Sequence, residues 1–386
     1  MKRPVKILSI FGTRPEAIKM APVVKTLAAA PGFAARVVIT AQHRQMLDQV
    51  LDLFEIKADY DLNIMQEGQS LTEITTRVLT RLEEVLAAEQ PDMVLVHGDT
   101  TTTFAAALAA FYQRVAVGHV EAGLRTHQKY FPFPEELNRR LTGVLADLHF
   151  APTATARANL LAEGVPPERI QVTGNTAIDA LFMTVRPTYK FCEPCLNALD
   201  FKRNRIIVLE AHRRENLGEP LEEIFRAVAA LVERHTDVEV VFPVHLNPKV
   251  QEPARRILGD HPRVHLLTPL AYGDFANLLA RAYLILSDSG GIQEEAPALG
   301  RPVLVLRSVT ERPEAVAAGT VRVVGTQAEA ILAAAEELLS NPAAYERMAR
   351  AANPYGDGRA AWRIRTGLEH WFGLRDEAPE ELIESL

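Results

Sequence analysis

The sequence of 386 residues contains only two cysteines, Cys192 and Cys195, and they form a single Cys-x-x-Cys pair. Such a pair could be a redox centre or half of a zinc site. No second Cys or His pair stands at the spacing of metal ligands, and the surrounding segment does not read as a strand-to-helix turn. We therefore interpret the two cysteines as incidental thiols in a reducing compartment.

The chain also lacks an excess of positive charge, because its formal net charge is -7 and its isoelectric point is about 5.9. Nucleic-acid binding needs clustered Lys and Arg side chains, so this class of partner is excluded. No apolar run approaches the roughly 18 residues of a membrane helix. The apolar run Val5–Ile10 is too short for the core of a signal peptide, because charge returns at Arg14. We expect a cytoplasmic protein without a membrane partner.

What the sequence does contain is a repeated alternation of short β-branched runs with longer, Ala- and Leu-rich amphipathic segments. This alternation is typical of parallel sheets covered by helices on both faces, and it occurs twice. It predicts an α/β fold of two Rossmann-like, doubly wound parallel-sheet domains that face a cleft. We predict strands at Lys6–Ile10, Arg36–Thr40, Met93–His97, Val115–Val120, Leu148–Ala151, Arg205–Leu209, Glu239–Pro243, Val264–Leu267, Tyr283–Ser287 and Val303–Leu306. We predict helices at Glu16–Ala30, Leu71–Ala88, Thr101–Tyr112, Leu221–Glu233, Phe275–Arg281 and Ala328–Leu339.

The two halves of the pattern give the expected domain boundaries. The first domain is placed at residues 1–173 and the second at residues 174–358. The closing segment Arg359–Gly373 has helical periodicity without a following strand, and we expect a C-terminal helix at 359–386 that returns to the first domain. Thr184–Arg203 holds both cysteines and has little periodicity, so we expect a surface connection. Ligands of such folds bind at the carboxyl ends of the strands.

The first motif at a strand end is FGTRPE at residues 11–16, which opens a helix. Gly12 permits a tight turn, Thr13 can cap the helix, and free backbone N–H groups beside Arg14 would suit a phosphate. The alternative is a well-capped helix with a solvent-facing arginine.

The second motif is SDSGGIQEE at residues 287–295, again a strand that runs into a glycine turn and a helix. Ser289 supplies a hydroxyl, and Gly290 and Gly291 allow the close approach of a diphosphate. A carboxylate one turn inward can hold a pair of ribose hydroxyls. A lone Gly-Gly turn is weak support, but a second helix start of this kind in the opposite domain strengthens it.

Motifs for redox cofactors, nucleoside triphosphates and catalytic zinc are missing. The one G-x-G-x-x-[GA] match, at Gly356–Ala361, does not follow a strand. Neither a Walker A loop nor an H-E-x-x-H motif occurs. We therefore expect no cofactor and no metal, and chemistry carried by side chains alone.

Three carboxylates stand on strand-end loops of the first domain: Asp99, Glu121 and Glu135. Asp99 could merely cap the following Thr-rich helix, and Glu135 could merely favour a helix dipole. Glu121 has the weakest structural explanation, because it ends an apolar strand. Acids that converge on one cleft are suited to general acid–base chemistry.

Two histidines, His212 and His245, end strands of the second domain. They could cap helices or satisfy groups in the core. With Arg213 and Arg214 beside His212, a role against phosphate or developing negative charge is at least as well supported.

Taken together, these segments resemble the non-hydrolysing UDP-N-acetylglucosamine 2-epimerases of bacteria over nearly the whole chain. The likeness is carried by FGTRPEAIKMAP, TAQHRQMLDQVL, DLNIM, VHGDTTTT, GHVEAGLRT, HRRENLGEP, PVHLNP, DSGGIQEEAP, TERPEAV and NPYGDG. The resemblance implies a fold of glycosyltransferase-B type, a homodimer, and reversible conversion of UDP-N-acetylglucosamine (UDP-GlcNAc) to UDP-N-acetylmannosamine (UDP-ManNAc). Several cell-envelope polysaccharides use that product.

The resemblance also implies a mechanism and a set of site residues. UDP is eliminated to leave a 2-acetamidoglucal, and it adds back after protonation of the other face of C2. Asp99, Glu121 and Glu135 match the catalytic acids, and His212 would assist the leaving diphosphate. The uracil would lie near Leu270 and Phe275. The full set of implied substrate-binding residues is Arg14, Lys19, Leu270, Phe275, Ser289, Gly290, Gly291, Glu295 and Arg312.

Many members of that family bind a second UDP-GlcNAc as an activator. The matching positions here are Gln42, Gln45, Glu135, Arg213 and His245. An additional arginine of that site is replaced by Gly68, so the resemblance implies activation that is retained but weakened.

Three positions depart from the family pattern: Glu210 replaces a Thr, His127 replaces a Gly and Phe131 replaces a Ser. The last two could reshape the sugar pocket or a lid. The alternative functions are a hydrolysing epimerase that releases N-acetylmannosamine, a glycosyltransferase of the same fold, and a regulator that only binds nucleotide sugars. The intact TERPEAV and HGDTTTT segments favour the non-hydrolysing branch.

Overall fold

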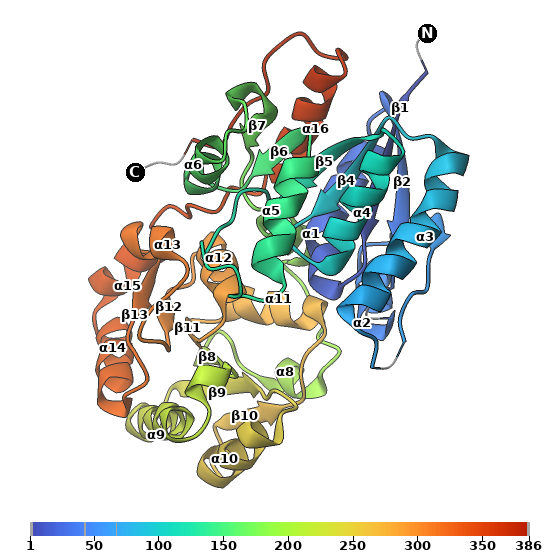
Figure 1. Cartoon of the computed structure of the whole chain (residues 1–386). Coiled ribbons are helices and arrows are strands. Elements are labelled where there is room, and N and C mark those ends of the chain that lie inside the picture. Colours follow the sequence, from blue (N-terminus) through green and yellow to red (C-terminus); the bar gives the residue numbers. More distant parts are fainter. Residues whose placement is uncertain (1–2, 42–43, 67, 384–386) are drawn as a thin grey trace. The chain divides into compact units, whose positions relative to one another are not determined.

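The computed structural model describes residues 3–41, 44–66 and 68–383, and this part of the chain divides into two compact units (Figure 1). The first unit holds the residues up to Met183 and those from Tyr355 onward, and the second runs over Thr184–Pro354. The sequence places these boundaries elsewhere, after residues 173 and 358.

The boundary differs because helix α7 (Thr176–Thr184) is tied to the first unit. The Asp179 carboxylate accepts hydrogen bonds from the backbone N–H groups of Ala360 at 3.1 Å and Ala361 at 2.8 Å. A Cβ added to Gly358 would meet the Phe182 ring at 2.3 Å, so the chain also packs closely against this helix there.

The described residues of the first unit form a parallel sheet of seven strands in the order β3-β2-β1-β4-β5-β6-β7. Its strands are β1 (Val5–Phe11), β2 (Phe33–Ile39), β3 (Tyr60–Asp61), β4 (Met93–His97), β5 (Ala116–Val120), β6 (Leu148–Ala151) and β7 (Ile170–Val172). The strand order reverses between β1 and β4, so the loops after these strands lead to opposite faces of the sheet. Parallel α/β folds bind ligands at this position.

Helices cover both faces of this sheet. They are α1 (Arg14–Ala28), α2 (Arg44–Leu53), α3 (Leu71–Glu89), α4 (Thr101–Tyr112), α5 (Glu135–Leu145), α6 (Ala154–Ala162), α7 and α16 (Ala360–Trp371). The central strands are mostly apolar because both faces are covered, and Val94, Leu95 and Val96 of β4 are fully buried.

The second unit repeats the arrangement within the described residues, with a parallel sheet of six strands in the order β10-β9-β8-β11-β12-β13. Its strands are β8 (Arg205–Glu210), β9 (Val238–Pro243), β10 (Val264–Leu267), β11 (Leu284–Ser287), β12 (Val303–Val305) and β13 (Val321–Val323). Its helices are α8 (Pro194–Ala198), α9 (Glu219–Arg234), α10 (Pro248–Leu258), α11 (Tyr272–Arg281), α12 (Gly290–Ala298), α13 (Pro313–Ala317), α14 (Ala328–Ser340) and α15 (Pro342–Ala349). Here the order reverses between β8 and β11.

Every strand and helix predicted from the sequence is present, with ends that shift by a few residues. The sequence missed the edge strands β3, β7 and β13, which are two or three residues long and too short to produce a periodic pattern. Among the described helices, none is both long and apolar enough to cross a membrane.

The segment Thr184–Arg203 is more ordered than the surface connection expected from the sequence. It contains α8, and the buried Asp274 carboxylate fixes it. That carboxylate accepts hydrogen bonds from Tyr189 Oη at 2.9 Å and from the Cys192 backbone N–H at 3.0 Å.

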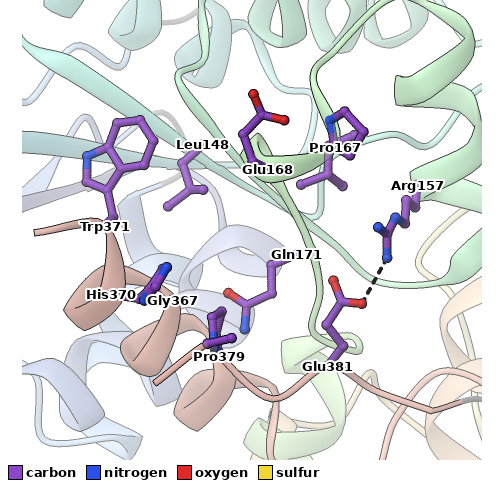
Figure 2. Close-up of a pocket in the computed structure, with 12 residues that line it drawn as sticks. Leu148, Arg157, Pro167, Glu168, Gln171, Gly367, His370, Trp371, Pro379 and Glu381 are labelled. Atoms are coloured by element: carbon purple, nitrogen blue, oxygen red, sulfur yellow. Dashed lines mark hydrogen bonds and ion pairs between the residues drawn. The ribbon is translucent and has the colours of Figure 1, made fainter. Parts of the chain in front are cut away.

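The C-terminal segment returns to the first unit, where α16 packs against α1. The expectation of a helix over 359–386 is wrong for residues 372–383, where the chain forms turns and irregular structure. Its Leu382 backbone N–H donates to the Val172 carbonyl oxygen at 2.8 Å, and Glu381 pairs with Arg157 at 2.8 Å (Figure 2).

Candidate active site

The loop after β1 enters α1 through a capping box formed by Thr13 and Glu16. The Glu16 carboxylate accepts hydrogen bonds from the backbone N–H groups of Gly12 at 3.1 Å and Thr13 at 2.8 Å. From the sequence we expect backbone N–H groups in this loop that are free to bind a phosphate. The expectation is wrong for the N–H groups of Gly12 and Thr13, because Glu16 binds both. The loop therefore offers an anion the side chain of Arg14, the first residue of α1, rather than these two groups.

Glu121 directly follows β5 and has a positive φ of 62°. This left-handed conformation costs a non-glycine residue roughly 1–2 kcal/mol, and such strain is concentrated at functional sites. The Glu121 carboxylate lies 2.5 Å from Nζ of Lys19 on α1 and 3.3 Å from Nε2 of His97 at the end of β4. Asn175 Nδ2 also donates to it at 3.3 Å. Glu121 is therefore held by groups from three different segments.

Asp99 lies just beyond β4 and does not cap α4, because Thr100 is the N-cap and its hydroxyl accepts from the Thr103 backbone N–H at 3.1 Å. Burial raises the pKa of Asp99 to about 6, with Arg139 opposing and the charges of Glu121 and Glu135 adding to the rise. Glu121 and Glu135, the other two acids expected from the sequence, thus both lie within electrostatic range of Asp99. A carboxyl group with this pKa exchanges a proton readily near neutral pH.

Glu135 and Glu136 begin α5 but have different surroundings. Oε2 of Glu135 is buried and has no hydrogen-bond partner among the described residues. Glu136 accepts hydrogen bonds from the backbone N–H groups of Thr126 at 3.0 Å and His127 at 3.1 Å, and lies 2.9 Å from Arg139. Glu136 therefore anchors the preceding loop, whereas Glu135 keeps acceptor capacity for another group.

His97 and His119 are buried histidines that the sequence analysis did not single out. Burial lowers the pKa of His97 to about 4 and that of His119 to about 3, so both rings are neutral at neutral pH. Nε2 of His119 lies 2.7 Å from the carbonyl oxygen of Gly98, which precedes Asp99. The pattern that could have identified them is a histidine at or next to the carboxyl end of each of two mostly apolar strands.

In the second unit, the loop after β11 enters α12 at two glycines. Ser289 is the N-cap and makes no side-chain capping hydrogen bond, so the first-turn N–H groups of α12 can bind an anion. A Cβ placed on Gly290 would lie 3.5 Å from Nη2 of Arg213 and 3.6 Å from Nη2 of Arg312. Two guanidinium groups therefore converge on the start of this helix.

Asp288 organises this corner, although the sequence analysis gave it no role. Its fully buried carboxylate accepts hydrogen bonds at 2.9 Å from the backbone N–H groups of His212 and Arg213 and from Asn216 Nδ2. The loop after β8 is thereby fixed against the end of β11. A single acid before a Gly-Gly turn was the only sequence feature that could have indicated it.

The rings of His212 and His245 stack with centroids 5.2 Å apart and planes at 7°. Burial lowers the pKa of His212 and the nearby His245 and Arg213 add to this effect, while the charge of Asp288 opposes it. Nδ1 of His245 accepts a hydrogen bond from the Asn247 backbone N–H at 3.1 Å. His212 is therefore a largely neutral group beside the start of α12.

The remaining predicted nucleotide contacts come from α11, α12 and nearby loops. Leu270 follows β10 and Phe275 lies on α11, and both are partly exposed. A Cβ on Gly291 would lie 3.8 Å from Oε1 of Glu295. The neighbouring Glu294 binds Nε of Arg312 and so orients that guanidinium.

The predicted activator site is only partly described. Gln42 and the side chain of Gln45 lie outside the described residues. Gly68 is exposed, has a φ of 69°, and has no heavy atom within 4 Å of an added Cβ. His127 has a φ of 61°, and Phe131 is 61% exposed.

Two other features do not belong to this site. The pocket of Figure 2, about 400 Å³, lies near the amino ends of β6 and β7, away from the carboxyl ends that carry the acids. Among the described residues, no group of three or more His, Cys, Asp or Glu side chains is arranged to hold a metal ion.

A family model described as UDP-N-acetylglucosamine 2-epimerase matches residues 25–369. The chain belongs to this family. It is 57% identical to the UDP-N-acetylglucosamine 2-epimerase of Bacillus subtilis (strain 168) over 378 residues, which are 98% of each chain. As a member of this family it is an enzyme, a UDP-N-acetylglucosamine 2-epimerase.

Solved structures agree with this assignment. The structure of MnaA from S. aureus with UDP is 53% identical with a TM-score of 0.88, covering 98% of this chain and 100% of that one. The UDP-GlcNAc 2-epimerase from Neisseria meningitidis, bound to UDP-GlcNAc, is 51% identical with a TM-score of 0.81, covering 94% and 99%. The glycosyltransferase-B type of fold expected from the sequence is confirmed.

Proposed function

We propose that this epimerase interconverts UDP-GlcNAc and UDP-ManNAc without net hydrolysis, by eliminating UDP and adding it back. The observation that carries the proposal is the group of acids formed by Asp99, Glu121 and Glu135. Hydrolysis needs a positioned water, whereas inversion of a C–H centre needs groups that take and return a proton. The solved relatives that hold UDP or UDP-GlcNAc support the substrate class.

The proposed chemistry begins with removal of the C2 proton by a carboxylate. No carbonyl group adjoins C2, so the C–H electron pair must form the C1–C2 double bond as the C1–O bond breaks. The electrons of that bond leave with the β-phosphate of UDP. A proton then returns to the other face of C2, and UDP adds to C1. Two acids on opposite faces satisfy this sequence, and a partly protonated Asp99 is suited to either role.

The second unit supplies stabilisation of the leaving diphosphate in this proposal. The uncapped start of α12 and the guanidinium groups of Arg213 and Arg312 would bind its negative charge. A neutral His212 keeps one ring N–H that can donate a hydrogen bond to the diphosphate. Arg14, Ser289, Gly291 and Glu295 complete the proposed nucleotide contacts, with Leu270 and Phe275 beside the base.

Product analysis by NMR tests this function directly. The enzyme is incubated with UDP-GlcNAc as the only sugar, and the anomeric protons of free and UDP-linked sugars are followed. We expect a UDP-linked manno product and no growth of free UDP or N-acetylmannosamine. Release of both in equal amounts would identify a hydrolysing epimerase, and no conversion without an acceptor would favour a transferase.

We further propose that the working form is a homodimer. Helices α4 and α5 are neighbours (Figure 1). Phe111 and Tyr112 on α4 are 57% and 65% exposed, and α5 carries the exposed apolar side chains Leu137, Leu141 and Val144. Such a face is suited to contact with its symmetric copy. Light scattering should give twice the chain mass for the native protein, and a monomer mass would remove this proposal.

We also propose that a second UDP-GlcNAc activates the enzyme, using Glu135, Arg213 and His245 among its contacts. No heavy atom lies within 4 Å of a Cβ added at the exposed Gly68, which leaves room for a ligand group there. The reaction would take place in the cytoplasm and supply the synthesis of cell-envelope polysaccharides.

A further inference from the structure

We propose that Glu210 makes nucleotide binding depend on pH, because its carboxyl group must carry a proton when a diphosphate occupies the start of α12. The inference rests on the proposed function of the second unit and adds to it a residue with no assigned role. Glu210 is the last residue of β8, one of the two strands at which the sheet order reverses.

The position of Glu210 connects it directly to α12. Its Oε2 accepts a hydrogen bond from the Ser287 hydroxyl at 3.3 Å. The same Ser287 oxygen accepts from the backbone N–H of Ser289 at 3.0 Å, and Ser289 is the N-cap of α12. The carboxyl group is thus linked to the residue that begins the anion site, through the Ser287 hydroxyl and through a hydrogen bond with the Ser289 side chain, and both hydrogen bonds lower the pKa of Glu210.

The charges around Glu210 disfavour its ionised form. Asp288 lies on the loop after β11, and Nδ1 of His212 lies 4.0 Å from Glu210 and 3.7 Å from Asp288. The positive charge of Arg213 opposes this effect and lowers the pKa of Glu210, and the ring of His245 stacks on that of His212. Burial raises the pKa of Glu210 to about 7, and the negative charge of Asp288 adds to the rise.

The cations of the site are already shared with other acids. Arg312 binds Glu294, and Nη2 of Arg213 lies 3.8 Å from Glu311. An ionised Glu210 would therefore add uncompensated negative charge beside an incoming diphosphate. A protonated Glu210 removes that repulsion.

The sign of the effect follows from linkage. The carboxyl group loses its proton as pH rises through about 7, so diphosphate affinity should fall as pH rises through this range. Conversely, diphosphate binding should draw a proton from solvent onto Glu210. A bound diphosphate that raises this pKa by about one unit would weaken binding about fivefold between pH 6 and pH 8.

The test is calorimetric titration of the full chain with UDP at several pH values. Each pH is measured in two buffers of different ionisation enthalpy, which gives the number of protons taken up. UDP and the histidines also titrate, so the comparison is between the native protein and Glu210→Gln, with Glu210→Thr as a smaller neutral variant. Glu336→Gln, which changes a half-buried acid on α14 that pairs with Arg234, is the matched control.

We expect proton uptake near pH 7 with native protein and with Glu336→Gln, and markedly less with both Glu210 variants. In those variants, UDP affinity should lack the roughly fivefold fall between pH 6 and pH 8 that is expected from Glu210. Near pH 8 they should bind UDP as tightly as the native protein or more tightly. Equal proton uptake and equal pH dependence in native protein and Glu210→Gln would overturn the inference while leaving the nucleotide site in place. Absence of any UDP binding to the native protein would instead remove the proposed nucleotide site, and this inference with it.

Discussion

Nζ of Lys19 lies 2.5 Å from Oε1 of Glu121, and this ion pair joins α1 to the residue that directly follows β5. Glu121 is also the acid with the left-handed backbone, φ 62°. The strand end places its carboxylate, the backbone conformation turns it, and Lys19 fixes one of its oxygens. This arrangement holds an acid in one position, as general acid–base catalysis requires.

Replacing Lys19 by Met should therefore lower kcat by about 10²-fold, because a poorly oriented acid transfers a proton slowly. The matched control is Lys25→Met on the same helix, where Lys25 lies 3.9 Å from an exposed Glu55. Steady-state kinetics on UDP-GlcNAc and thermal melting of both variants check the prediction. Native turnover in Lys19→Met would show that this ion pair has only a structural role.

The pH dependence of turnover should reflect Asp99. Its carboxyl group is protonated below about pH 6 and ionised above it. If Asp99 removes the C2 proton, kcat/KM for UDP-GlcNAc should have a limb that rises with pH through about 6, before the fall expected above pH 7 as Glu210 loses its proton. Asp99→Asn should lower kcat by about 10²-fold or more and abolish this limb, while Asp52→Asn on the surface should change neither. A rising limb that persists in Asp99→Asn would show that the limb reflects the titration of another group.

Gly290 should be tolerant of a methyl group in the free protein and intolerant of it in the complex. An added Cβ would lie 3.5 Å from Arg213 and 3.6 Å from Arg312, which are ordinary contact distances. Gly290→Ala should therefore keep its melting temperature but lose roughly 1.5–3 kcal/mol of UDP binding energy, the contribution of a charge-assisted hydrogen bond. Calorimetry that gives native affinity would place the diphosphate elsewhere.

Activation by a second UDP-GlcNAc should appear as sigmoidal kinetics and as little conversion of UDP-ManNAc supplied alone. Gly68→Arg should lower the half-saturating UDP-GlcNAc concentration, because it adds a diphosphate contact in open space. The φ of 69° costs the new side chain roughly 1–2 kcal/mol, so Gly68→Ala is the control that carries this cost without the charge. Hyperbolic kinetics with a full reverse reaction would show that the second site is not used.

The sequence predicted the fold well where elements are long and repeated. The alternation of apolar strands such as β4 with the amphipathic α3 is sufficient to predict two parallel sheets. It could not predict α7 in the first unit, because the hydrogen bonds from Ala360 and Ala361 to Asp179 join residues far apart in the chain. The irregular chain after Trp371 is likewise held by a distant residue, because its Leu382 backbone N–H donates to the Val172 carbonyl oxygen.

The sequence could propose candidate site residues but not their surroundings. The acids Asp99, Glu121 and Glu135 could be selected because each follows a strand or begins a helix. The capture of two backbone N–H groups by Glu16 could not be read from the sequence, because a capping box and a phosphate loop share the same residue types. The role of Asp288 likewise depends on β8 and β11 being neighbours.

Isotope incorporation at C2 tests the central claim most directly. The enzyme is incubated with UDP-GlcNAc in deuterated water, and the C2 positions of both UDP-linked sugars are followed by proton NMR and mass spectrometry. We expect deuterium at C2 of UDP-ManNAc from the first turnovers and at C2 of UDP-GlcNAc as the reaction reverses, with no free sugar accumulating. Epimerised product that retains its original C2 hydrogen would contradict the proposed elimination and re-addition.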